Sequence, residues 1–152
     1  MRIWVDADAC PNAIKAVLFR AAERVQVATV LVANHHVRVP PSPYLSSLQV
    51  PGGFDVADHA IVDSLAAGDL VVTADVPLAA AVVRLGATAL NPRGTLYDSE
   101  NVHDLLARRN LSEQLREAGA ITGTTSALGK ADVQAFANQL DRWLTARRDS
   151  RG

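Results

Sequence analysis

Residues 1–11 read MRIWVDADACP, and the fold class can be recognised from them. The apolar run Ile3–Val5 predicts a short buried strand, and Asp6 continues it directly. Pro11 suits the first turn of a helix, because its missing N–H is not needed there. A strand followed at once by a helix is the start of an α/β unit. Asp6 and Asp8 therefore lie in a strand-to-helix connection, where carboxylates serve either as helix caps or as part of a site.

The same alternation of strand and helix continues to about residue 90. Continuous apolar runs are typical of strands buried on both faces of a parallel sheet. Four strands are expected, at Ile3–Val5, Thr29–Ala33, Leu70–Thr73 and Thr88–Leu90. Helices are expected at Asp55–Ala66 and Pro77–Leu85, with a first one at residues 11–22. The pattern predicts an α/β, three-layer fold with a mostly parallel sheet of about four strands flanked by helices.

The remaining segments are expected to be a long loop and further helices. The loop is residues 34–54, and one more short strand could fall within it at Ser47–Val50. Apolar spacing predicts a helix or a bent pair over residues 102–115 and an amphipathic helix over Val133–Leu144. We expect one domain over residues 1–146 and a frayed tail at 147–152.

Composition limits the classes of function. The chain has 152 residues, a net charge of -1 and a single cysteine, so a cysteine metal cluster is excluded. No apolar run approaches the roughly 20 residues that cross a bilayer, and acidic residues interrupt the start of the chain where a signal peptide would be apolar. No membrane association is expected, and a cytoplasmic location is the default. Since the charge is nearly neutral, a nucleic acid would have to bind a local basic patch or a metal ion.

The acidic residues are placed where ligands gather in parallel sheets. Asp6 ends the first expected strand and Asp75 follows the third, and ligands bind beyond the carboxyl ends of such strands. Asp55 and Asp58 lie three residues apart, so they share a helix face. Carboxylates brought close together repel one another unless a cation neutralises them. Mg²⁺ or Mn²⁺ would fit, because both prefer oxygen ligands.

Each carboxylate also has a structural alternative. Asp8 and Asp75 both precede a helix-opening proline, so each is as well placed for an N-cap as for a ligand. Asp55 is expected to be a cap, whereas Asp58 borders an apolar helix face. Asp6 has no evident structural role and is the strongest ligand candidate. Two further aspartates, Asp63 and Asp69, are expected on the solvated surface.

A resemblance to a known family adds to this interpretation. The stretches WVDADACPN, LVANHHVRVPPS, GFDVADHAIVD, GDLVVTADVPLA and ALNPRGTLYD, together with AITGTTSALGKADVQAFANQLDRWL, resemble the YaiI/YqxD family of bacterial proteins. That family is regarded as PIN-like, and PIN domains are metal-dependent ribonucleases with acidic residues at the carboxyl edge of a parallel sheet. The resemblance implies catalytic and metal-binding roles for Asp6, Asp58 and Asp75, with Asp8 assisting. The stretch TGTT near the C-terminus departs from the pattern expected of relatives, so no role is assigned to that loop.

Two other functions compete with a nuclease. A strand ending in DAD also resembles the haloacid dehalogenase phosphatases, in which the first aspartate, here Asp6, is the nucleophile and the second, here Asp8, its acid/base partner. Thr73 resembles the second motif of that superfamily, but the expected strand at Thr88–Leu90 leads to NPRG rather than to further acids. The fold could also be a non-catalytic module that binds RNA or a protein. The segment Gly123–Lys130 fails the P-loop spacing.

Basic residues supply candidates for binding RNA. Arg38 lies in the long loop and Arg93 follows the fourth expected strand, so both are expected near the acidic edge. They are the predicted substrate-binding residues. The arginines of the later helix, Arg108, Arg109 and Arg116, are attributed to solubility.

Overall fold

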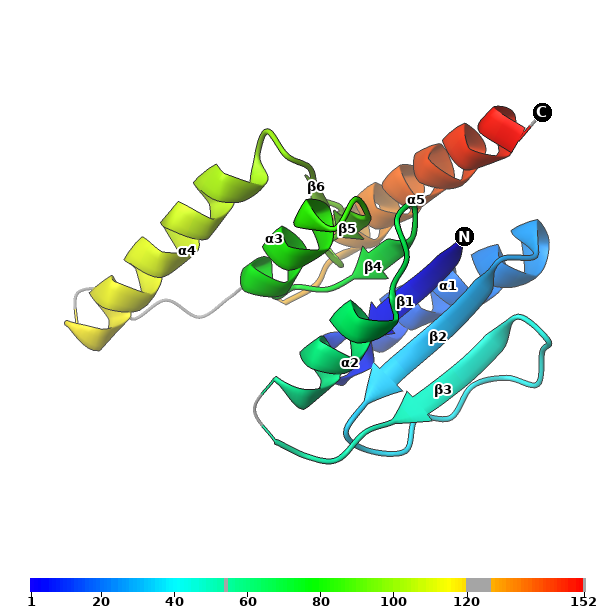
Figure 1. Cartoon of the computed structure of the whole chain (residues 1–152), viewed down its shortest axis with the longest axis horizontal. Coiled ribbons are helices and arrows are strands. Elements are labelled where there is room, and N and C mark those ends of the chain that lie inside the picture. The colour runs from blue at the N-terminus through cyan, green and yellow to red at the C-terminus, as the bar shows by residue number, and fades with distance from the viewer. Residues whose placement is uncertain (54, 120–126, 152) are drawn as a thin grey trace.

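The computed structural model describes residues 1–53, 55–119 and 127–151 and has a mixed α/β fold (Figure 1). The residues described form one six-stranded sheet in the order β3-β2-β1-β4-β5-β6. The strands are β1 (Arg2–Asp6), β2 (Ala28–Ala33), β3 (Leu45–Gln49), β4 (Leu70–Val72), β5 (Thr88–Leu90) and β6 (Leu96–Tyr97). Only the β5–β6 pair is antiparallel. The predicted α/β class with a mostly parallel sheet is confirmed.

Strand β1 lies at the centre of the sheet, paired in parallel with β2 and β4. Its side chains alternate between the two faces, as a strand requires. Ile3 and Val5 enter one core cluster, and Trp4 enters the other. Because both faces are covered, the strand is apolar at every interior position, which is why the opening stretch identifies the fold class.

Helices cover both faces of the sheet. One layer holds α1 (Asn12–Val25) and α5 (Lys130–Arg151), which pack on the Ile3 face. The other holds α2 (Val56–Ser64), α3 (Val76–Arg84) and the start of α4 (Val102–Glu117), and α4 then extends away from the sheet (Figure 1). A three-residue 3₁₀ turn, η1 (Ala7–Ala9), joins β1 to the segment before α1.

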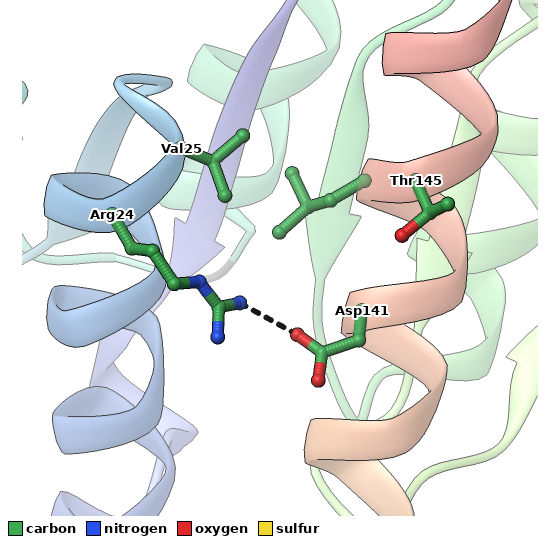
Figure 2. Close-up of a pocket in the computed structure, with 5 residues that line it drawn as sticks. Arg24, Val25, Asp141 and Thr145 are labelled. Carbon is green, nitrogen blue, oxygen red and sulfur yellow. Dashed lines mark hydrogen bonds and ion pairs between the residues drawn. The ribbon is translucent and has the colours of Figure 1, made fainter.

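Helices α1 and α5 lie side by side, and a polar contact closes the outside of their seam. Figure 2 shows Arg24 of α1 reaching across to Asp141 of α5, with Nη2 and Oδ1 2.7 Å apart. Val25 and Thr145 line the same small cavity. Both charged side chains are more than half exposed, so the apolar residues beneath the pair carry the packing.

The sheet has two strands beyond the four expected. Strand β3 begins two residues before the expected Ser47, and four of its five residues are exposed because it forms an edge of the sheet. An exposed edge strand lacks the apolar run that marks a central one. Strand β6 has two residues, which is too short for any periodicity, and pairs with β5 after the tight turn that contains Gly94.

The C-terminal helices differ from expectation at their ends. Helix α4 is one continuous helix, which is the first of the two predicted alternatives, and it ends two residues later than expected. Helix α5 begins before the expected Val133 and extends beyond the expected end at Leu144, as far as Arg151. The TGTT stretch and the first half of the Gly123–Lys130 segment lie outside the residues described. None of the helices described is both long and apolar enough to cross a membrane.

Asp69 is a correction to the expectation of a solvated residue. It is 3% exposed and lies directly before β4, at the amino edge of the sheet. Its carboxylate accepts hydrogen bonds from the backbone N–H groups of Arg2 (3.0 Å) and Ala66 (2.8 Å). It also accepts one from the indole Nε1 of Trp4 at 3.0 Å. A buried carboxylate with three donors is well compensated, so Asp69 is a structural residue.

Candidate metal centre

The order of the strands places the candidate site. The chain runs outward from β1 through β2 to β3 and then returns to the other side of β1 as β4. Open parallel sheets bind ligands at such a reversal, beyond the carboxyl ends of the strands. Asp6 is the last residue of β1, and Asp75 follows β4 by three residues. The two aspartates therefore flank the switch point, as their places at strand ends predict.

Three carboxylates form a compact group beside this point. Among the residues described, Asp55, Asp58 and Asp75 each offer an oxygen, and these oxygens lie within 4.8 Å of one another. The sequence places Asp58 and Asp75 among the ligands, but it assigns Asp55 to a helix cap. In the structure Asp55 occupies the N-cap position of α2 with φ 61° and makes no side-chain capping bond. Its side chain belongs to the acidic group instead.

The electrostatics of the group are unfavourable without a counter-ion. The pKa of Asp58 is raised to about 7, first because burial penalises its charge. The negative charges of neighbouring carboxylates raise it further, in the order Asp75, Asp6 and Asp55, and a hydrogen bond with Asp55 acts in the same direction. Like charges at this separation favour protonation of one member unless a cation is present.

Asp6, the last residue of β1, is close enough to the group of three for its charge to act on Asp58, and it is 9% exposed. Burial raises the pKa of its carboxyl above the usual value, and the charges of Asp75 and Asp8 add to the rise. A hydrogen bond from Thr73 opposes it. Asp6 is the residue that the sequence favours most strongly as a ligand, yet it lies outside the set whose oxygens meet the 4.8 Å spacing. The charge of Asp6 nevertheless acts on both Asp58 and Asp75.

Thr73 connects the acids at the ends of β1 and β4. Its hydroxyl donates to Oδ2 of Asp6 at 3.0 Å and accepts from the backbone N–H of Asp75 at 3.0 Å. Asp75 in turn accepts a bond from the backbone N–H of Leu78, also at 3.0 Å, and so caps α3. Asp75 therefore combines the two roles that its sequence position left open, a helix cap and a member of the acidic group.

Asp8 has a different environment from the one expected. It does not cap α1, because the N-cap of that helix is Pro11, without a side-chain bond. One carboxylate oxygen accepts from the backbone N–H of Asn34 at 3.0 Å. The other lies 2.7 Å from Nδ1 of His35. Asp8 thus fastens η1 to the segment after β2 and is turned toward His35.

The group of three opens into a cavity of about 400 Å³ between α2, α3 and α4. Its lining includes His59 beside Asp58 and the guanidinium-bearing Arg109 of α4. Arg109 also pairs with Glu113 at 2.8 Å. The sequence attributes Arg109 to solubility, because only the packing of α4 against α3 brings it near the acids. Asp55, by contrast, could have been recognised as a member of the site from the sequence, because its three-residue spacing from Asp58 places both side chains on one helix face.

Neither of the two arginines predicted to bind substrate lines this cavity. Arg93 follows β5, and its Nη1 lies 2.9 Å from Oδ2 of Asp132 at the start of α5. Arg38 lies after β2 and lines a separate cavity on the α1 side. The carboxyl edge of the sheet therefore carries an acidic site and, apart from it, a basic one.

The donor set suits a hard divalent cation. The grouped side chains are all carboxylates, which Mg²⁺ and Mn²⁺ prefer over softer ligands. Asp55 and Asp58 come from one helix and Asp75 from the start of another, so the ligands rest on elements rather than on a free loop. Residues Asp55, Asp58 and Asp75 would hold the ion, with the charge of Asp6 behind them.

The fold and the site together define a class of protein. It is an α/β protein with a mostly parallel sheet, in which carboxylates gather at the switch point between β1 and β4. A sequence profile described as "Uncharacterized BCR, YaiI/YqxD family" matches residues 4–146. The chain belongs to this YaiI/YqxD family, as its motifs suggest.

Close relatives extend over the whole chain. The UPF0178 protein of Halorhodospira halophila is 60% identical over 152 residues and covers 100% of both chains. The UPF0178 protein of Dechloromonas aromatica is 59% identical over 144 residues, 95% of this chain and 96% of its own. That of Shewanella amazonensis is 60% identical over 144 residues, 95% and 97% of the two chains. No solved structure gives a significant match.

Proposed function

We propose that this protein is a divalent-metal-dependent nuclease that hydrolyses phosphodiester bonds, with RNA as its substrate. The observation that carries the proposal is the group Asp55, Asp58 and Asp75, whose oxygens lie within 4.8 Å of one another at the mouth of a cavity. Carboxylate groups of this kind hold Mg²⁺ or Mn²⁺ in enzymes that act on phosphates. The resemblance to PIN-like proteins supports RNA as the substrate.

The residues of the chain have distinct parts in this proposal. A bound Mg²⁺ or Mn²⁺ would activate a water and neutralise charge on the phosphate. Asp55, Asp58 and Asp75 would hold the ion, and Asp6 would strengthen the negative potential from behind. Thr73 would keep Asp6 and Asp75 in fixed positions through its two hydrogen bonds. Arg109, which lines the same cavity from α4, would contact the phosphate.

Asp8, Arg38 and Arg93 have supporting parts at most. Asp8 is bound to Asn34 and His35, so its part would be to fix the end of β1 rather than to bind the ion. The contact of Arg93 with Asp132 supports a structural role for that arginine. Arg38 keeps its proposed role in binding substrate, at a distance from the acids.

The phosphatase alternative has less support. It needs Asp6 to be an accessible nucleophile, whereas the side chain is almost buried and does not line the acidic cavity. A phosphatase would release inorganic phosphate from small monoesters, and a nuclease would not. A binding module without turnover would hold RNA and Mn²⁺ and leave the RNA intact.

The proposal is tested with matched aspartate variants. Asp58→Asn and Asp6→Asn remove charge inside or behind the acidic group, and Asp63→Asn makes the same change at an exposed position of the same helix as Asp58. Calorimetry should show Mn²⁺ binding by the wild type and Asp63→Asn, with affinity at least about tenfold lower for Asp58→Asn. Cleavage of a mixed RNA panel should follow the same order. Equal Mn²⁺ binding by Asp58→Asn and Asp63→Asn would contradict the site.

A further inference from the structure

A second cavity at the carboxyl edge of the sheet is basic. It has a volume of about 370 Å³ and lies between the first half of α1 and the segment after β2. Its lining comprises Asn12, Lys15, Ala16, Phe19, His35, His36, Val37 and Arg38. No acidic residue is among them within the part of the chain that the structure describes, although the whole chain carries 16 acidic residues against 15 basic ones. The volume falls in the range of small-ligand sites, about 300–1,000 Å³.

The two permanent cations of this cavity are uncompensated. Among the side chains that the structure describes, no carboxylate forms an ion pair with Lys15 or Arg38. Exposed cations such as Arg20 and Arg84 share this lack of an ion pair, and what sets Lys15 and Arg38 apart is that they line one cavity together. Cations that converge on a cavity without counter-charges favour an anionic ligand. Phosphate is the anion that lysine and arginine bind most readily.

The basic cavity is linked to the acidic site through a single residue. Asp8 contacts His35, which lines the basic cavity, and its charge also acts on Asp6. The basic cavity lies at the end of β2 and the acidic group at the end of β4, with β1 between them. The basic cavity lies on the face covered by α1, and the acidic group on the face covered by α2 and α3. A strand that occupies both cavities must therefore cross the carboxyl edge of the sheet from one face to the other.

An aromatic ring lies beside the cations. Phe19 is partly exposed and lines the same cavity as Lys15 and Arg38. Proteins that hold single-stranded nucleic acids combine a cationic groove with aromatic rings on which bases stack. A duplex would not offer its bases for such stacking.

We propose that the cavity between α1 and residues 35–38 binds a phosphate and the adjoining base of single-stranded nucleic acid. It holds the strand beside the acidic site. The proposal rests on the proposed function only for the position of the bond that is cleaved. Lys15 and Arg38 contact the phosphate, and Phe19 contacts the base.

The test measures binding of a fluorescein-labelled single-stranded RNA by anisotropy, with EDTA present so that no cleavage occurs. The proteins are the wild type, Lys15→Gln, Arg38→Gln and the double variant, all as the full chain. Arg84→Gln is the control, because it removes the same charge from an exposed position at the far end of α3. Each single variant should bind about tenfold more weakly, and Arg84→Gln should bind within about twofold of the wild type.

Salt dependence gives a second readout that a folding defect would not mimic. In the double variant, loss of the contacts to this one phosphate should reduce the slope of log affinity against log salt by about 0.7 for a single strand. The wild type should also bind a duplex of the same sequence more weakly than the single strand. A double variant with wild-type affinity and slope would overturn the proposal, as would a wild type that binds no RNA or prefers the duplex.

The two proposals fail in different ways. RNA binding that depends on Lys15 and Arg38, without cleavage in Mn²⁺, would keep the basic cavity and reject the nuclease. Suppose instead that cleavage depends on Asp58, and that the Lys15 and Arg38 variants change neither cleavage nor RNA binding. That result would keep the nuclease and reject the basic cavity as a binding site.

Discussion

The two edges of the sheet treat buried carboxylates in opposite ways. At the amino edge, Asp69 is buried with three hydrogen-bond donors from β1 and the end of the segment after α2. At the carboxyl edge, Asp55, Asp58 and Asp75 face one another, and burial and mutual repulsion raise the pKa of Asp58 to about 7. The difference separates a carboxylate that stabilises the fold from carboxylates that weaken it. A group retained at the cost of stability is a candidate for function.

The largest change in stability is expected when the carboxylate of Asp69, at the amino edge, is removed. Asp69→Ala leaves the indole N–H of Trp4 and two backbone N–H groups without acceptors. We expect the free energy of unfolding to fall by about 3 kcal/mol, at roughly 1 kcal/mol for each donor. Urea unfolding followed by circular dichroism measures this loss. Asp63→Ala, at an exposed position, is the control and should change stability by less than about 0.5 kcal/mol.

A smaller loss is expected from the residue that organises the carboxyl edge. Thr73→Val keeps the shape of the side chain but removes the donor to Asp6 and the acceptor for the N–H of Asp75. We expect the free energy of unfolding to fall by about 1.5 kcal/mol, because two buried polar groups lose a partner. The pKa of Asp6 should rise further, since the bond from Thr73 lowers it. Unchanged stability in the same urea assay would show that these bonds contribute little.

Removal of a charge at the carboxyl edge should raise the free energy of unfolding rather than lower it. Asp58→Asn relieves repulsion within the acidic group, so without metal we expect a gain of about 1 kcal/mol at pH 7.5, a modest value because solvent screens this partly exposed group. Mn²⁺ should reverse this order of stability. At one hundred times its dissociation constant the wild type gains about 2.7 kcal/mol, whereas a variant with at least tenfold weaker binding gains no more than about 1.4 kcal/mol. Thermal or urea unfolding with and without Mn²⁺ gives both values.

The pH dependence of this gain follows from the raised pKa. Folded Asp58 titrates at about 7, whereas an unfolded aspartate titrates at about 4. Between these values the folded state binds more protons, so the wild type loses stability as pH rises from about 4 to 7. The advantage of Asp58→Asn should therefore be absent near pH 4 and complete above pH 7. A constant difference across that range would contradict the raised pKa.

The smallest effect is expected at the seam between α1 and α5. Asp141 is exposed and has a single partner, Arg24 (Figure 2). Asp141→Asn should change the free energy of unfolding by less than about 0.5 kcal/mol, because exposed ion pairs contribute little. This variant calibrates the comparison in the same urea assay. A large effect here would mean that the stability losses expected for the Asp69 and Thr73 variants cannot be attributed to burial and to lost hydrogen bonds.

The sequence predicts the parts of this molecule that depend on local pattern. Strand β1 is recognised because an apolar run ends at Asp6, and Asp75 because it follows another such run. Asp55 and Asp58 share a helix face by their spacing, although the left-handed backbone at Asp55 that prevents capping has no signature in the sequence. These residues come together because parallel strands end at one edge.

Features that depend on distant partners are the ones that the sequence does not indicate. Asp69 resembles a surface residue until Trp4, far away along the chain, supplies its indole N–H. Arg109 reaches the acidic cavity only because α4 packs on α3. The edge strand β3 is exposed and β6 is very short, so neither carries a strong apolar pattern.

The central position of β1 has a consequence for biosynthesis. Strand β1 precedes the other strands of the sheet along the chain and must be enclosed on both sides, and its partner β4 begins only at Leu70. A nascent chain therefore cannot bring Asp6 beside Asp75 until the residues as far as Asp75 have been made, and the sheet is complete only once β6 follows. Such long-range pairing slows folding relative to local contacts. Any capture of a cation by the acidic group is thus a late event, which follows enclosure of the first strand rather than guiding it.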